Sequence, residues 1–272
     1  HPGIVPVHEL GIDPKGHVFF TMKLVKGETL GEVFKKVKTG EGGWNVTRAL
    51  SVVLRVCEAM SFAHEKGVIH RDLKPANIMV GRFGETYVMD WGLSRVLGRK
   101  EVKDIRIRPD QNISDVRTER RETKSGNPGG SGTSAASLLK MDGDQIGTPC
   151  YMPPEQARGD LAAIGAPSDV YAVGSILYHL LTGHEPFVEP GQRITPHAVL
   201  AMVLHGPPPP LNSIAKDVPA ELAAICDRAM ARKIDARYPS MSELAEDLRA
   251  YLEHRVVKAY ETGALAEMRK WV

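Results

Sequence analysis

The eight residues His-Arg-Asp-Leu-Lys-Pro-Ala-Asn, at positions 70–77, constrain this chain more than any other part of its sequence. They place a lysine two positions and an asparagine five positions after an aspartate, in a tight loop that we expect between short strands. Asp72 can orient a substrate hydroxyl and accept its proton, and Lys74 can set positive charge beside a transferring phosphoryl group. Asn77 can reach a magnesium ion. Phosphoryl transfer depends mainly on positioning and charge stabilisation, so this set is chemically sufficient for it.

A second group of chemical residues is Met89-Asp90-Trp91-Gly92, about thirteen positions beyond Asn77. The carboxylate of Asp90 follows a predicted strand and suits a hard, oxygen-seeking ion such as Mg²⁺. We expect Trp91 to pack inward and to hold that carboxylate in place.

The hydrophobic pattern predicts a small β-rich start followed by a mostly helical body. The predicted elements are a hairpin of strands over 4–10 and 18–24, a helix over 45–66 with Gly67 as its C-cap, strands over 68–69, 77–80 and 87–89, helices over 168–182 and 221–230, and a last helix that opens at a capping box formed by Ser240 and Glu243.

The periodicity vanishes from about Arg95 to Gln145, which we interpret as a long mobile loop with too little apolar surface to offset its ordering entropy. Its basic residues are interspersed with acidic ones and lack aromatic stacking partners, which argues against nucleic-acid binding.

Composition excludes several classes of protein. The 272 residues are 42% hydrophobic and 25% charged, as in ordinary globular proteins, and a net charge of +2 is too mild for a nucleic-acid surface. Three scattered cysteines without C-x-x-C spacing predict neither disulfides nor a zinc site. No apolar run approaches the roughly 18 residues of a membrane span, and no signal peptide is recognisable. We therefore expect a cytoplasmic protein. Because the chain begins at His1 and ends in Trp271-Val272, we also expect it to be a piece of a longer protein.

These motifs resemble those of protein kinases, in the right order over residues 1–255. Residues 70–77 are similar to the catalytic loop H-R-D-L-K-x-x-N, and residues 90–92 to the D-F-G motif, with Trp91 in place of Phe. Residues 147–155 resemble the segment G-T-x-x-Y-M-A-P-E that closes the activation loop of a Ser/Thr kinase, with Pro153 in place of Ala. The nearest likeness is to the bacterial, eukaryotic-like (Hanks-type) Ser/Thr kinases.

The resemblance implies an α+β, two-lobe fold with a partial β-rich N-lobe and a complete, mainly helical C-lobe. Residues 1–25 would be the remnant of the N-lobe and the hinge, and residues 26–255 the C-lobe, with a long activation-loop insertion over 93–146. Residues 256–272 would begin a C-terminal linker or helix.

The resemblance also implies roles for individual residues. The catalytic residues would be Asp72, Lys74, Asn77 and Thr148, with Asn77 and Asp90 holding the metal. The nucleotide would lie against Met22 as gatekeeper, Lys23 and Val25 at the hinge, Thr29 near the ribose, Met79 on the pocket floor, and Asp90. Structural and regulatory roles would fall to His70, Arg71, Trp91, Gly92, Glu155, Asp169 and Arg237.

The expected activity is transfer of the ATP γ-phosphate to Ser/Thr hydroxyls of protein substrates, with Mg²⁺ as the metal and Mn²⁺ as an alternative. Arg71 indicates activation by a loop phosphate, added by autophosphorylation in trans between self-associated copies. We expect no nucleic-acid partner, and membrane contact only through parts absent here. The candidate phosphorylation sites are Thr118, Thr123, Ser125, Ser131, Thr133, Ser134 and Ser137.

Two alternatives remain open. A small-molecule phosphotransferase of the aminoglycoside-kinase type shares the Asp-to-Asn spacing but lacks Lys74 and the segment 147–155. The second alternative is a pseudokinase or ATP-binding scaffold. The only point in its favour is that the sequence shows no glycine-rich phosphate loop, no strand lysine and no glutamate to pair with that lysine. For the same reason we expect the chain alone to be weak or inactive.

Overall fold

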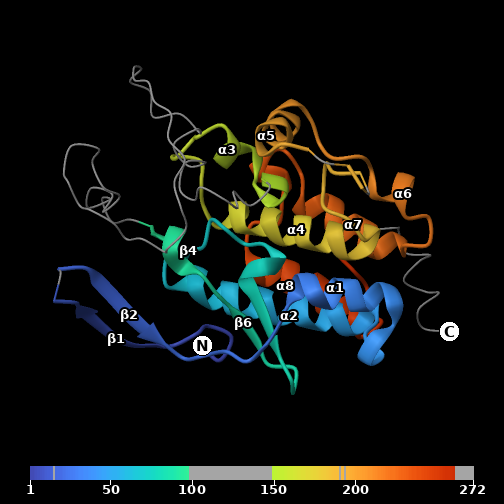
Figure 1. The fold of residues 1–272 in the computed structure, drawn as a ribbon. Helices are drawn as coiled ribbons and strands as arrows, with labels where there is room; N and C mark the ends of the chain where they lie inside the picture. Colours follow the sequence, from blue (N-terminus) through green and yellow to red (C-terminus); the bar gives the residue numbers. More distant parts are fainter. Residues whose placement is uncertain (15, 98–148, 190, 193, 261–272) are drawn as a thin grey trace.

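The computed structural model describes residues 1–14, 16–97, 149–189, 191–192 and 194–260 (Figure 1). Thr148, the seven candidate phosphorylation sites, most of the predicted activation-loop insertion and the end of the predicted C-terminal linker therefore lie outside the described residues. Within them, a small set of strands lies beside a larger helical part, so the predicted mixed α+β class is confirmed.

The strands form three small antiparallel sheets. One is the hairpin β1–β2, one has the order β3-β5-β6, and one pairs β4 with β7. Their bounds are β1 Val7–Ile12, β2 Val18–Met22, β3 Gly27–Thr29, β4 Val68–Ile69, β5 Ile78–Gly81, β6 Thr86–Val88 and β7 Arg95–Val96.

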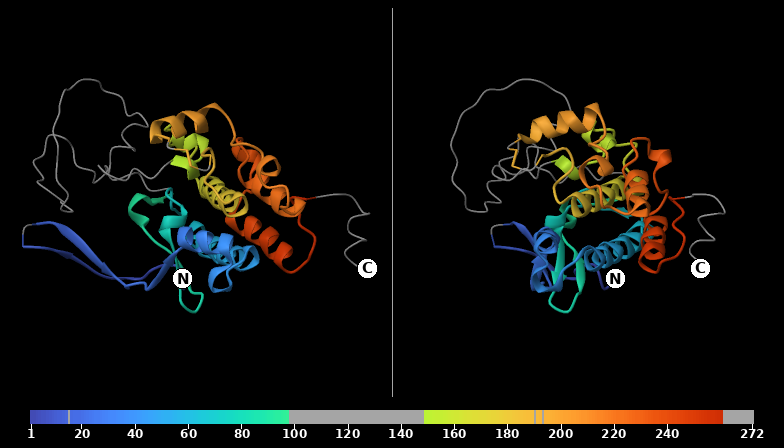
Figure 2. Two further views of the ribbon diagram at one scale, coloured as in Figure 1. Left: turned by 45° about the vertical axis from the view of Figure 1, so that its right-hand side comes forward. Right: turned by 90° about the vertical axis from the view of Figure 1, so that its right-hand side faces the viewer.

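The helical part is built around α4, which is buried along most of its length. Helices α2 and α7 pack against α4, and α8 packs against α2 and α4, so that their apolar faces form one core (Figure 2). The α-helices are α1 Leu30–Thr39, α2 Val46–Glu65, α3 Pro154–Ala157, α4 Ala166–Thr182, α5 Pro196–His205, α6 Leu211–Ile214, α7 Ala220–Ala229 and α8 Met241–Leu252. Short 3-10 turns are η1 Glu41–Gly43, η2 Pro75–Asn77, η3 Trp91–Leu93, η5 Pro149–Tyr151 and η6 Ile234–Ala236.

Local sequence signals explain where these helices begin and end. The side chain of Asn45 accepts a hydrogen bond from the Arg48 amide at the start of α2, and Gly183, with φ 78°, ends α4. The Ser240 hydroxyl accepts a hydrogen bond from the Glu243 amide, which is the Ser240 half of the predicted capping box. The C-cap of α2 is Lys66 rather than Gly67. Gly67 instead takes the left-handed conformation, φ 72°, one residue later.

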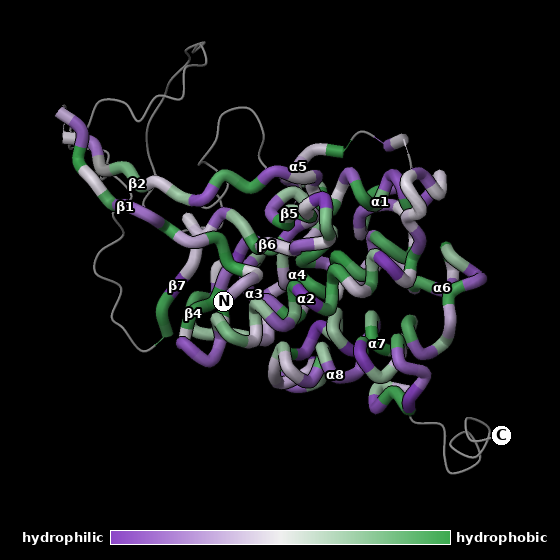
Figure 3. Tube along the Cα trace, turned by 90° about the horizontal axis from the view of Figure 1, so that it is seen from below, coloured by the Kyte–Doolittle hydropathy of each residue, from purple (hydrophilic) through white to green (hydrophobic). Residues whose placement is uncertain are grey.

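The β1–β2 hairpin extends away from the helical part (Figure 2). It carries hydrophobic residues on both strands (Figure 3), and Leu10 is 73% exposed while Phe20 is 57% exposed. The segment before the hairpin is tied to β6, because the Val88 amide donates to the Gly3 carbonyl and Ile4 bridges Val88.

No helix among the described residues is long and apolar enough to span a membrane.

Candidate active site

The loop between β4 and β5 brings the three residues of the first motif into contact. The Lys74 ammonium lies 2.9 Å from Oδ2 of Asp72, and the Asn77 side-chain amide donates to the same Oδ2 at 3.0 Å and to the Asp72 carbonyl at 2.8 Å. The 3-10 turn η2, with Pro75 at its start, carries Asn77 back toward Asp72. The Asp72 carboxylate is therefore oriented from two sides while it stays partly exposed to a reactant.

Asp169, in the first turn of α4, holds the backbone of this loop. Its carboxylate accepts the amides of His70 at 2.8 Å and Arg71 at 2.9 Å, although about a hundred residues separate them in sequence. Arg71 has a φ of 68°, a conformation that L residues rarely adopt and that needs such support. His64 of α2, a residue that the sequence analysis does not single out, contacts the same carboxylate at 2.8 Å.

Gln156 is a second supporting residue that sequence reasoning misses. Its side chain is 7% exposed, and its amide nitrogen donates to the Arg71 carbonyl at 2.8 Å. Gln156 lines the same cavity as Asp72 and Lys74. Its position directly after Glu155 in the third motif is the only sequence signal that could have pointed to it.

Asp90 lies beyond the end of β6, with φ 56°, and its carboxylate accepts the Gly92 amide at 3.4 Å. Trp91 is half-buried. Its ring nitrogen donates to the Val88 carbonyl at 3.1 Å, and its ring lies against that of His70, with centroids 4.7 Å apart. His70 in turn contacts the Met89 carbonyl at 2.9 Å, so the two motifs pack directly on each other.

The predicted metal ligands fit a divalent cation. The Met89 amide donates to the Asn77 carbonyl at 2.8 Å, which brings Asp90 next to Asn77 in space. Both side chains offer oxygen atoms, the donors that Mg²⁺ prefers. The described residues hold no cluster of three or more His, Cys, Asp or Glu side chains suited to a metal. Two protein ligands, rather than an all-protein cage, suit an ion whose remaining ligands are water and substrate phosphates.

Glu155 and Arg237 form a buried ion pair below this site. Two contacts of 2.7 and 2.8 Å join the guanidinium to the carboxylate, and Ser168 donates to the same carboxylate at 2.7 Å. Burial by itself would raise the pKa of Glu155, but the bonds and charge of Arg237, together with Ser168, outweigh it and hold that pKa below its usual value. The pair ties helix α3, which contains Glu155, to Arg237 directly after η6.

Three of the residues predicted to contact a nucleotide, Met22, Thr29 and Met79, lie on two sheets. Thr29 and Met79 are register partners in the β3–β5 pair. Thr29 is also the N-cap of α1, in a capping box with Glu32, so its hydroxyl already serves the helix. Met22, at the end of β2, is 44% exposed.

The predicted hinge residues follow β2. The Lys23 amide donates to the Pro6 carbonyl at 3.2 Å, so this amide is already bonded within the fold. The Lys23 ammonium reaches the Tyr87 hydroxyl of β6 at 3.0 Å. Val25 lies in the irregular segment between β2 and β3.

A loop aspartate held by a buried aspartate of the central helix, beside a second carboxylate at a strand end, defines a protein-kinase-like catalytic centre. The comparisons agree with this class. The protein kinase domain family matches residues 1–110. The chain is 30% identical, over 94% of its length, to serine/threonine-protein kinase PknD of Protochlamydia amoebophila, and 34% identical, over 91%, to serine/threonine-protein kinase PknB of Mycolicibacterium smegmatis.

The chain therefore carries a protein kinase domain related to the bacterial Hanks-type Ser/Thr kinases, with a small β-sheet N-lobe and a helical C-lobe. This family uses ATP and a divalent metal. The chain spans 24% of the length of the first relative and 33% of the second.

Proposed function

We propose that this protein transfers the γ-phosphate of ATP to Ser or Thr hydroxyls of protein substrates. The observation that carries the proposal is the contact of Asp72 with both Lys74 and Asn77, in a loop that Asp169 holds by its backbone. The names of the relatives, all Ser/Thr protein kinases, support the same class of reaction.

In this mechanism the Asp72 carboxylate receives the substrate hydroxyl and accepts its proton as the oxygen attacks the γ-phosphorus. The bond from that phosphorus to the β–γ bridging oxygen breaks, and ADP leaves. Lys74 keeps positive charge beside the transferring group, where negative charge is spread over the phosphoryl oxygens. Asn77 and Asp90 would hold Mg²⁺, which when bound neutralises the phosphates of the nucleotide. The nucleotide itself would lie against Met79 and the hinge at Lys23.

We further propose the division into an N-lobe remnant over 1–25, a C-lobe over 26–255 and a linker over 256–272. Activation-loop autophosphorylation between self-associated copies, with Arg71 receiving the phosphate, belongs to the same proposal. The 272 residues contain no glycine-rich phosphate loop and no strand lysine, so we expect the chain alone to transfer phosphate slowly.

The test compares Asp72→Asn with Asp217→Asn, an exposed aspartate that follows α6 and serves as the matched control. Phosphate transfer from labelled ATP to a Thr-containing protein is measured in the longest available protein that carries this chain. We expect Asp72→Asn to lower turnover by a factor of about 100 to 10,000, the usual contribution of a positioned base, and Asp217→Asn to leave it unchanged.

Equal turnover in the two variants would contradict the role of Asp72. ATP binding that depends on Mg²⁺, without transfer in any of the three proteins, would favour the binding-scaffold alternative.

A further inference from the structure

A groove runs between α1 and the C-terminal end of α4, beside the catalytic loop. Lys74 lines this groove and also contacts the Asp72 carboxylate at 2.9 Å, so one end of the groove lies next to the proposed catalytic base. A peptide whose hydroxyl reaches Asp72 would have its neighbouring residues in this groove. The side chains that line the groove would therefore influence which peptide sequences bind.

Most charged groups of the groove already have partners within the fold. Lys74 pairs with Asp72, and Glu32 accepts the amide and the hydroxyl of Thr29 at 2.7 and 2.9 Å in the capping box of α1. Glu185 accepts hydrogen bonds of 3.5 Å from the Tyr151 hydroxyl and from the Cys150 thiol. These carboxylates form no ion-pair contact with the two remaining cations, although the charge of Lys35 contributes, after the bonds from Thr29, to lowering the pKa of Glu32.

The remaining cations are Lys35 and Lys38, both exposed on α1. They are three residues apart, so they lie on the same face of the helix. Among the residues that the structure describes, no carboxylate oxygen comes within the 4.0 Å of an ion pair with either ammonium. The neighbouring Lys36, by contrast, pairs with Glu28 on another side of α1.

Lys38 is directed across the groove by the end of α4. An added Cβ on Gly183 would lie 2.5 Å from Cε and 3.1 Å from Nζ of Lys38, so the end of the lysine side chain lies over Gly183. Burial first, and then the charge of Lys38, lower the pKa of His179 to about 4, so this imidazole is neutral at physiological pH. The unpaired positive charge of the groove thus comes from the two lysines.

We infer that this groove binds a carboxylate side chain, Asp or Glu, carried by the protein substrate near its phosphorylated Ser or Thr. The inference rests on the proposed function, because it names the peptides that the same catalytic base would receive. Its physical basis is charge complementarity between a peptide carboxylate and the pair Lys35 and Lys38.

The test uses short Thr peptides in which a single Glu or its neutral isostere Gln is moved through about six positions on either side of the Thr. Turnover by the unaltered protein, by Lys35→Gln/Lys38→Gln and by the matched control Lys36→Gln is compared. We expect at least one position at which Glu lowers KM about three- to tenfold relative to Gln, the size expected for two exposed ion pairs. The double variant should bring this ratio to about one with kcat little changed, and Lys36→Gln should retain it.

A KM ratio near one at every position in the unaltered protein would overturn the inference, as would a ratio that persists in the double variant. Absence of turnover with every peptide would instead count against the proposed function. In that case fluorescence anisotropy with the labelled Glu and Gln peptides, without ATP, measures how tightly each peptide binds the groove, independently of turnover. The same three- to tenfold difference in Kd, lost in the double variant, is then expected, and equal affinities would overturn the inference.

Discussion

Arg237 is the largest fully buried side chain of this fold, and its guanidinium meets the Glu155 carboxylate where water is excluded. Loss of one partner leaves the other charge buried without compensation, which costs about 3–5 kcal/mol. We therefore expect Arg237→Met to lower the free energy of unfolding by about that amount, measured by urea denaturation at pH 7.

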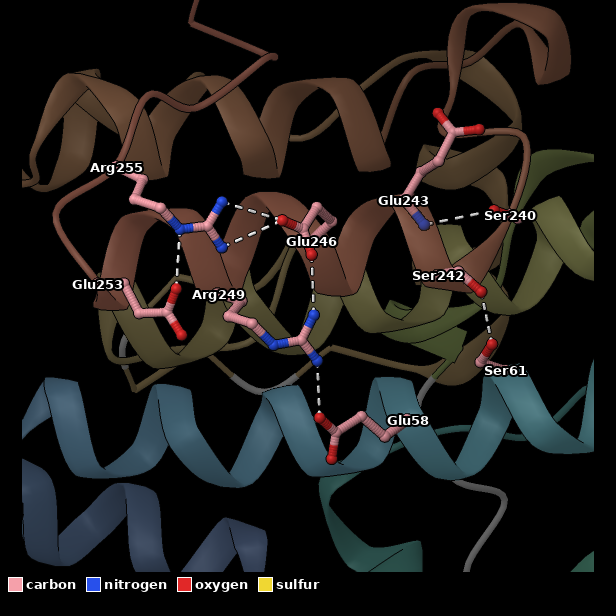
Figure 4. A network of polar contacts seen from close by, with 9 residues as sticks. All are labelled: Glu58, Ser61, Ser240, Ser242, Glu243, Glu246, Arg249, Glu253 and Arg255. Atoms are coloured by element: carbon pink, nitrogen blue, oxygen red, sulfur yellow. Dashed lines mark hydrogen bonds and ion pairs between the residues drawn. The ribbon is translucent and has the colours of Figure 1, made fainter.

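Arg249 of α8 is the matched control for this prediction. It pairs with Glu58 of α2 and with Glu246, in a network at the surface between the two helices (Figure 4). Solvent screens such pairs, so Arg249→Ala should cost less than about 1 kcal/mol. A similar decrease in the free energy of unfolding in both variants would show that the buried ion pair stabilises the fold no more than the surface network does.

At the scale of helices, Gly174 determines how closely α4 approaches α7. An added Cβ would lie 2.8 Å from Cβ of Ala229 and 2.8 Å from Cγ of Met230, closer than packed carbon atoms allow. Alanine is the better helix former by about 1 kcal/mol, but overpacking of a core costs about 1–3 kcal/mol. Because of the backbone at Ala229, we expect Gly174→Ala to be destabilising by about 1–2 kcal/mol in the same denaturation experiment.

Gly206, the C-cap of α5, provides the contrast. An added Cβ there would meet nothing within 4 Å, and the backbone is extended at φ −160°. Gly206→Ala should therefore change the free energy of unfolding by less than about 0.5 kcal/mol. If Gly174→Ala also leaves the free energy of unfolding unchanged, the α4–α7 contact is looser than the structure indicates.

At the scale of the whole molecule, the buried residues that the structure describes are concentrated in the helical part and in the three-stranded sheet that packs on it. Among the described residues no third strand joins the β1–β2 hairpin, which exposes Leu10 and Phe20, and an isolated hairpin is only marginally stable in water. We expect its amide hydrogens to exchange at least about 100-fold faster than those of α4 in hydrogen–deuterium exchange of the intact chain.

Strand β5 is the internal control, because it lies between β3 and β6 and is bonded on both edges. Its amides should exchange at rates close to those of α4. Protection of β1 and β2 equal to that of β5 would mean that another part of the protein, or a second copy, covers the hairpin.

Short-range spacing made much of the fold and the core of the site predictable. Two apolar runs on either side of the turn Asp13-Pro14-Lys15-Gly16 predicted the hairpin, and apolar steps of three and four residues predicted α2. Helix α1 was missed, although Thr29 and Glu32 form the kind of capping box that marks a helix start and its apolar residues recur at steps of three and four, at Leu30, Val33, Phe34 and Val37. The positions of Thr148 and of the loop candidates for phosphorylation stay predictions.

By itself, the sequence determined the chemical groups of Asp72, Lys74 and Asn77, because all three lie within six residues and one local turn brings them together. Resemblance to kinases, rather than spacing, pointed to Asp169 and Arg237. Only the tertiary structure decided that Gln156 binds the Arg71 carbonyl, that His64 shares the Asp169 carboxylate, and that Lys35 and Lys38 face the groove beside Lys74. These contacts join residues that are far apart in the sequence. A local sequence pattern does not indicate which helix faces and loops will lie against each other in the folded core. The physical reason is that burial of the apolar faces of α2, α4 and α8 fixes the positions of their polar residues.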